Sequence, residues 1–65
     1  MKWREIFYLN TVNNTTTLTV GKAEMASDKI VELIDPDVDN NFYVEFSDGS
    51  CYFIPSTRIV KVIGS

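Results

Sequence analysis

The chain has 65 residues, of which 45% are hydrophobic, enough for one small domain and too few for two. It contains one cysteine and no histidine, which excludes an internal disulfide, the Ser/His/Asp and Cys/His catalytic groups and most zinc sites. Six basic residues against nine acidic ones give a net charge of -3, the wrong sign for general electrostatic binding of phosphates.

The chain is rich in β-branched and aromatic residues, so we predict a single all-β domain over residues 1–65. Residues 4–12 read as the first strand, followed by an Asn-Asn turn. The threonine-rich residues 15–20 form either a hairpin with this strand or a long, partly extended loop. Residues 22–26 are the only helix-compatible stretch and are long enough for one helical turn. Residues 28–34 form the next strand, which ends at Asp35-Pro36.

The strongest local signal is a hairpin around Asp48-Gly49, the dipeptide favoured in a two-residue type I′ turn. This turn pairs Phe46 with Cys51, Glu45 with Tyr52 and Val44 with Phe53. One face of the hairpin then faces the core, and it comprises Phe42, Val44, Phe46, Cys51 and Phe53. The other face comprises Tyr43, Glu45, Tyr52 and Ile54. After a break at residues 55–57, residues 58–63 form the last strand.

Residues 28–63 resemble the small SH3-like barrels. Residues 28–33 are similar to the family's strand that opens with an acidic residue, and Phe42-Tyr43 occupies the place of its usual aromatic pair. Residues 54–59, with Pro55 and Ser56, are similar to the hydrophobic-Pro-Ser-Asn-Tyr-hydrophobic signature before the last strand. The resemblance implies a five-stranded barrel with a short helical turn before the last strand.

The same resemblance associates Tyr8, Phe42, Pro55 and Arg58 with a shallow peptide-binding groove. Arg58 replaces the tyrosine that helps to form the proline-binding groove in SH3 domains, so polyproline recognition is not carried over. Each of the four residues also has an ordinary structural role: Phe42 in the core, for example, and Pro55 as a strand breaker.

Tyr43, Tyr52 and Ile54, joined across the hairpin by Glu45, form the most suggestive surface. Because a small barrel buries one face of each strand, these side chains are expected to form an exposed patch for a partner. The alternative is that strand twist, or the N-terminal residues with Trp3, covers them. If they are exposed, a homodimer through this face or through an edge strand is the simplest outcome.

Two further features have structural interpretations. Residues 35–41 place carboxylates at alternating positions, as a calcium loop does at its start. Asn40 stands where that loop needs glycine, and Phe46 stands where it needs glutamate, so we expect a solvated acidic turn and no metal. Cys51 is expected to pack as a small buried hydrophobic residue, without catalysis.

We therefore expect a non-enzymatic protein-interaction module without cofactor or catalytic residues. Its predicted partner-binding residues are Tyr8, Phe42, Tyr43, Tyr52, Ile54, Pro55 and Arg58. Dispersed basic residues make nucleic acid an unlikely partner, but a nucleic-acid-binding barrel of the Sm-like type remains one alternative. A structural protein that acts by self-association is the other.

The sequence also bears on location. No apolar run approaches the roughly 18 residues of a membrane span, and no signal peptide opens the chain. We expect no membrane association and a cytoplasmic location. The short chain and its start at Met1 suggest a free-standing product of the kind common among phage and bacterial accessory or inhibitor proteins.

Overall fold

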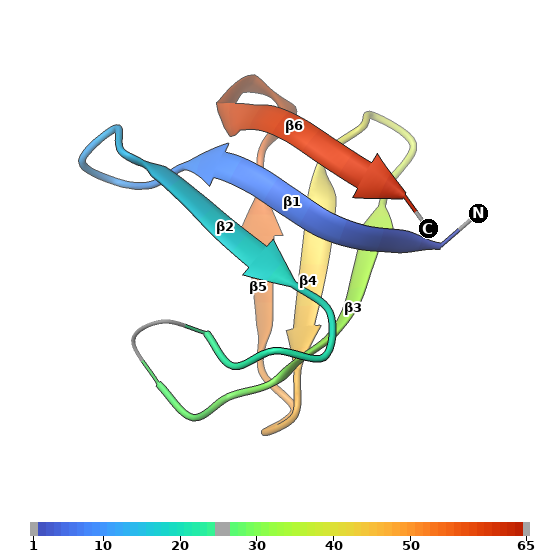
Figure 1. Ribbon diagram of the computed structural model, residues 1–65. Coiled ribbons are helices and arrows are strands. Elements are labelled where there is room, and N and C mark those ends of the chain that lie inside the picture. Colours follow the sequence, from blue (N-terminus) through green and yellow to red (C-terminus); the bar gives the residue numbers. More distant parts are fainter. Residues whose placement is uncertain (1, 25–26, 65) are drawn as a thin grey trace.

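The computed structural model describes residues 2–24 and 27–64 of the chain. These residues form an all-β fold of six strands with a single 3-10 turn, η1, before the last strand (Figure 1). The elements are β1 (Trp3–Leu9), β2 (Thr15–Thr19), β3 (Val31–Pro36), β4 (Phe42–Phe46), β5 (Cys51–Ile54), η1 (Ser56–Arg58) and β6 (Ile59–Gly64). The all-β prediction is confirmed, and so is the short helical turn before the last strand.

The strands lie in two antiparallel sheets of order β2-β1-β6 and β3-β4-β5. The strands of one sheet cross those of the other, and the start of β1 lies beside the end of β6 (Figure 1). The structure has six strands, one more than the five predicted, because the threonine-rich segment forms β2, a hairpin partner of β1. In the described ranges, no ladder joins the two sheets into a closed barrel.

The β1-β2 hairpin is closed by an asparagine-rich turn. The side-chain Oδ1 of Asn10 accepts hydrogen bonds from the backbone N–H groups of Val12 and Asn14, each at 3.0 Å. Asn13 takes a φ of 61°, a left-handed conformation that asparagine tolerates better than most residues. The turn predicted at Asn13 therefore exists, and the first strand ends earlier than predicted, at Leu9.

After β2 the chain passes from one sheet to the other. Gly21, with φ 89°, donates its N–H to the Val31 carbonyl at 2.8 Å, and Val31 donates to the Lys22 carbonyl at 3.0 Å. Ala23 bridges to Ile30 in the same antiparallel sense. Residues 22–24 are thus paired with residues 29–31, so the helical turn that the sequence allows at residues 22–26 does not form at residues 22–24; residues 25–26 lie outside the described residues.

The β4-β5 hairpin corrects the predicted register. Phe46 donates its N–H to the Ser50 carbonyl at 2.9 Å, and Gly49 donates to the Phe46 carbonyl at 3.0 Å. A type I′ turn would need positive φ at both Asp48 and Gly49, but only Gly49 has it, at 87°. The loop therefore has three residues, 47–49, and Gly49 occupies its left-handed position.

The extra loop residue shifts every pair across the hairpin by one. Glu45 faces Cys51, Val44 faces Tyr52 and Tyr43 faces Phe53. Phe42 faces Ile54. Since side chains alternate between the faces of a strand, this shift reverses the predicted faces of β5.

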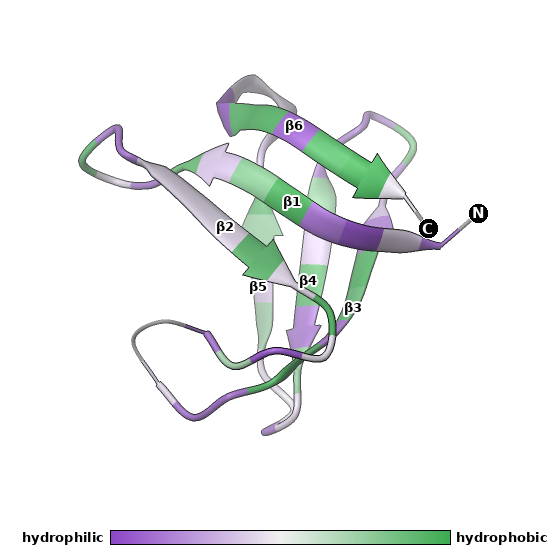
Figure 2. Cartoon of the chain, in the orientation of Figure 1, coloured by the Kyte–Doolittle hydropathy of each residue, from purple (hydrophilic) through white to green (hydrophobic). Residues whose placement is uncertain are grey.

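The core lies between the two sheets. Its buried side chains are Ile6, Tyr8, Leu18, Val31, Ile34, Phe42, Val44, Phe46 and Ile54. Trp3 of β1 packs edge-on against Phe42 of β4, with ring centroids 5.7 Å apart. Hydrophilic residues concentrate in the loops, whereas every strand has hydrophobic segments (Figure 2).

Candidate functional site

The residues predicted for a peptide groove do not meet at one surface. Tyr8 and Phe42 are buried in the core, and so is Ile54, which was predicted for the exposed face of the hairpin. Pro55 is half-buried and precedes η1. Neither of the two pockets described below is lined by Tyr8, Phe42, Pro55 or Arg58.

Arg58 is committed to contacts within the chain. It lies in η1, outside the last strand where it was predicted, and its Nε donates to the Leu9 carbonyl oxygen at 3.0 Å. Its Nη2 donates to the carbonyl oxygen of Asn10 and, at 3.2 Å, to Oδ1 of Asn13. The guanidinium therefore joins η1 to the β1-β2 turn and uses three of its five N–H donors within the chain.

Tyr52 projects from β5 towards Tyr8. The two ring centroids are 5.7 Å apart, and Tyr52 keeps 41% of its surface exposed at the edge of the sheet. Burial raises the pKa of the Tyr8 phenol, with further contributions from nearby Tyr52 and Glu24. Tyr52 thus lies on the core-facing side of β5 and remains partly exposed at the sheet edge. Tyr43 lies on the opposite side of the sheet.

A different surface gathers exposed apolar side chains: the side of the β3-β4-β5 sheet that faces away from the core. We call it the outer face. Cross-strand pairs place its members together, and they are Leu33, Asp35, Tyr43, Glu45, Cys51 and Phe53. Leu33, Tyr43 and Phe53 are each slightly more than 40% exposed. The rings of Tyr43 and Phe53 contact each other, with centroids 5.1 Å apart.

The outer face is hollowed and acidic. A shallow depression of about 290 Å³ is lined by Leu33, Asp35, Tyr43, Glu45 and Cys51. Two of these five side chains are carboxylates and none is basic. Cys51 is exposed here, which corrects the prediction that it packs in the core. An apolar surface bordered by carboxylates is suited to a partner that offers both apolar groups and positive charge.

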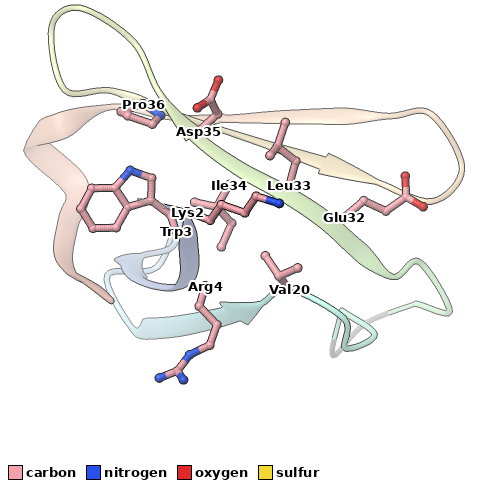
Figure 3. A pocket seen from close by; sticks show the side chains of 9 residues that line it. All are labelled: Lys2, Trp3, Arg4, Val20, Glu32, Leu33, Ile34, Asp35 and Pro36. Atoms are coloured by element: carbon pink, nitrogen blue, oxygen red, sulfur yellow. The ribbon is translucent and has the colours of Figure 1, made fainter. Parts of the chain in front are cut away.

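A larger pocket of about 520 Å³ lies beside β3, where the two sheets meet. Its apolar lining includes Trp3, Val20, Leu33, Ile34 and Pro36. Lys2, Arg4, Glu32 and Asp35 supply the charged groups. In Figure 3 the Lys2 side chain lies across the pocket, whereas the guanidinium of Arg4 points away from it.

The acidic turn at residues 37–41 is held by its own hydrogen bonds. Asp37 Oδ1 accepts from the backbone N–H groups of Asp39 at 2.8 Å and Asn41 at 3.0 Å, and Asp37 Oδ2 accepts from Asn41 Nδ2 at 3.2 Å. Partial desolvation opposes these bonds, but together they hold the pKa of Asp37 below its usual value. In the described ranges, no three His, Cys, Asp or Glu side chains are grouped as metal ligands.

Comparisons with known proteins do not assign the chain to a family. No protein-family model matches it, and no curated protein or solved structure matches it significantly. Among the residues that the structure describes, no helix has the length and apolar character needed to cross a membrane. The surfaces themselves are therefore the basis for assigning a function.

The sequence pattern predicts Tyr43 and Glu45 on one exposed face, where the structure has them, but it does not predict the other members of the outer face. The predicted two-residue turn places Phe53 and Cys51 on the core face, whereas both lie on the outer face. Leu33 lies in the strand predicted over residues 28–34, for which the sequence does not indicate the exposed face. The position of Val20 and the formation of the pocket beside β3 depend on how the two sheets cross. The sequence has no local pattern that predicts this crossing.

Proposed function

We propose that this chain is a non-enzymatic protein-interaction module that binds its partner through the outer face. The observation that carries the proposal is the grouping of Leu33, Tyr43 and Phe53, each slightly more than 40% exposed, on one sheet face around a shallow depression. Exposed apolar groups gathered on one side of a small domain are typical of interaction sites.

The order of elements supports an SH3-like arrangement for this module. A first hairpin is followed by the three-stranded β3-β4-β5 meander, a 3-10 turn, and a last strand that pairs with β1. In this arrangement the module differs from a proline-binding SH3 domain, because Arg58 is hydrogen-bonded to the β1-β2 turn. The outer face replaces the groove as the binding surface.

Charge favours protein over nucleic acid as the partner. Both charged side chains of the depression are carboxylates, Asp35 and Glu45. Of the basic side chains, Arg58 is hydrogen-bonded within the chain and the ammonium of Lys29 lies 4.9 Å from the ring centroid of Phe46. A partner rich in phosphates would meet like charge on this surface.

Peptide selection tests the proposal. A random peptide library is panned against the chain, and the dissociation constants of the enriched peptides are measured for a Leu33→Ser/Tyr43→Ser variant. A Val12→Ser/Val60→Ser variant is the matched control, because these two side chains are exposed away from the outer face.

We expect the outer-face variant to lose at least about tenfold in affinity and the control to keep it. Circular dichroism confirms that both variants are folded. Equal affinity for both variants, or no enrichment of peptides at all, would contradict the proposal.

A further inference from the structure

The edge of β3 next to the larger pocket is hydrogen-bonded to no other described strand. Among the described strands, β3 is hydrogen-bonded to β4 alone. At its start, Val31 exchanges hydrogen bonds with Gly21 and Lys22, so the edge is covered there. Beyond the irregularity between Val31 and Leu33, no pairing to residues 20–24 continues.

The hydrogen-bond pattern shows which backbone groups point outward. Asp37 donates its N–H to the Asn41 carbonyl at 2.8 Å, and this pair lies in register with the Asp35–Tyr43 and Leu33–Glu45 pairs. Hydrogen-bonded and non-hydrogen-bonded pairs alternate in an antiparallel ladder, so Leu33 and Asp35 direct their backbone groups towards β4. The N–H and C=O of Ile34 then point away from β4.

The pocket lies directly beside this edge. Trp3, Val20 and the side chain of Ile34 form apolar walls, as Figure 3 shows. Leu33 and Asp35 line both this pocket and the depression on the outer face, so the two hollows meet along β3. An extended segment placed along the edge would contact both hollows at once, because its side chains alternate between the two faces of the sheet.

The two sides of such a segment would meet different sets of charged groups. On the outer face, its side chains would lie near the carboxylates of Asp35 and Glu45. On the pocket side they would meet apolar walls and charged groups of both signs, Lys2 and Arg4 together with Glu32 and Asp35. Positive side chains are therefore favoured on the outer side and apolar ones on the pocket side.

The same charges argue against a second copy of the chain as the occupant. Two copies joined edge to edge through β3 would bring the Asp35 and Glu45 carboxylates of both copies onto one sheet face, and each chain carries a net charge of -3. Like charges on neighbouring strands are destabilising.

We propose that the partner is an extended, basic polypeptide segment that adds to β3 as a fourth strand. This inference rests on the proposed function and names the partner's chemistry. The segment pairs through its main chain with Ile34, inserts apolar side chains between Trp3 and Val20, and places lysine or arginine side chains over Asp35 and Glu45. Strand addition of this kind takes affinity from the backbone and specificity from alternate side chains.

Synthetic peptides of about eight residues test this model. The probe is a capped peptide of alternating valine and lysine, compared with a valine–glutamate peptide and with a valine–lysine peptide N-methylated along one edge. Binding is followed by two-dimensional amide NMR of the isotope-labelled chain, together with hydrogen exchange at Ile34.

We expect the valine–lysine peptide to bind at least about tenfold more tightly than either comparator and to slow exchange at the Ile34 amide. Amides of β2, at the edge of the other sheet, should be unchanged. Asp35→Lys should weaken binding of the valine–lysine peptide by about fivefold and strengthen that of the glutamate peptide. Asp39→Lys is the matched control, since Asp39 lines neither pocket.

Several results would overturn the inference. Equal binding of the N-methylated peptide would exclude main-chain pairing, and equal binding of the acidic peptide would exclude the basic partner. No binding of any peptide would overturn it outright. Exchange protection at Ile34 in the peptide-free chain, together with a dimer in sedimentation equilibrium, would identify a second copy as the occupant. Shifts confined to Tyr43 and Phe53 would leave the proposed function standing and refute strand addition.

Discussion

Arg58 and Leu9 are 49 residues apart in sequence, and the Nε of Arg58 donates to the Leu9 carbonyl oxygen at 3.0 Å. The same guanidinium reaches Asn10 and Asn13, so a single side chain holds η1 against the β1-β2 turn. The position that the SH3 resemblance assigned to ligand binding is therefore a structural position in this fold.

Replacing Arg58 should destabilise the chain without touching the outer face. Hydrogen bonds from a charged donor contribute more than neutral ones, so Arg58→Ala should lower the free energy of unfolding by about 2 kcal/mol. Arg58→Lys should recover only part of this loss, because lysine lacks the guanidinium fork. Urea denaturation measures both variants. The control is Lys61→Ala, which removes one exposed positive charge on β6 and should have little effect on the free energy of unfolding. If this control lowered the free energy of unfolding as much as Arg58→Ala, the Arg58 contacts would not be the cause.

Gly49 should be sensitive to substitution for backbone reasons alone. It has φ 87°, and a Cβ built on it would meet no atom within 4 Å. Gly49→Ala should therefore cost about 1 kcal/mol in unfolding free energy, and Gly49→Asn less. D-alanine introduced by chemical synthesis is the sharpest control, since it favours positive φ and should not lower stability. If L- and D-alanine destabilised the hairpin equally, backbone conformation would not be the reason.

The acid stability of the chain should depend partly on Asp48. Hydrogen bonds from the Ser50 hydroxyl and then the Ser50 backbone N–H hold the pKa of Asp48 below its ordinary value of 3.8. Because the folded pKa is the lower one, the carboxylate stabilises the fold above the unfolded value, and this contribution is lost as the pH falls through the folded pKa.

Unfolding free energies measured between about pH 5 and pH 2 should therefore fall more steeply for the natural chain than for Asp48→Asn. In an NMR titration, Ser50→Ala should raise the pKa of Asp48 towards 3.8, whereas Ser56→Ala should not move it. An unchanged Asp48 titration in Ser50→Ala would show that the hydrogen bond from the Ser50 hydroxyl does not cause the shift.

Thiol reactivity distinguishes the two hairpin registers. Cys51 is exposed in the observed register, whereas the two-residue turn would have placed it on the core face. The folded chain should react with a disulfide reagent within about tenfold of the unfolded rate. A Cys51→Ser/Val44→Cys variant supplies the buried comparison, since Val44 is fully buried, and should react only on opening. Slow reaction of Cys51 itself would restore the register that the sequence alone suggested.

Local sequence patterns were enough to predict the all-β fold and the hairpin between β4 and β5. They could not determine the length of the hairpin loop. Asp-Gly suits both a two-residue loop and a three-residue loop with glycine in the left-handed position. The contacts of Ser47 are consistent with the second: its N–H donates to the Ile30 carbonyl at 2.8 Å and its Oγ accepts from the Ile30 N–H at 3.0 Å. These contacts join the loop to the chain before β3. They are tertiary contacts, so a local sequence pattern cannot predict them.

The candidate site was harder to predict than the fold for a related reason. A shift of one residue moved Phe53 and Cys51 from the core to the outer face and Ile54 from the surface to the core. The free edge of β3 depends on the chain crossing between sheets after Gly21. Alternation along a strand predicts that two faces differ, but only the partner strands decide which one is buried.

The edge-on contact between Trp3 and Phe42 gives the molecule an internal optical reporter. Trp3 is the chain's single tryptophan, it belongs to one sheet, and its aromatic neighbour belongs to the other. The indole also lines the pocket beside β3. Its emission spectrum should therefore respond both to separation of the sheets and to an occupant of that pocket, so unfolding and binding can be followed in the same unlabelled sample.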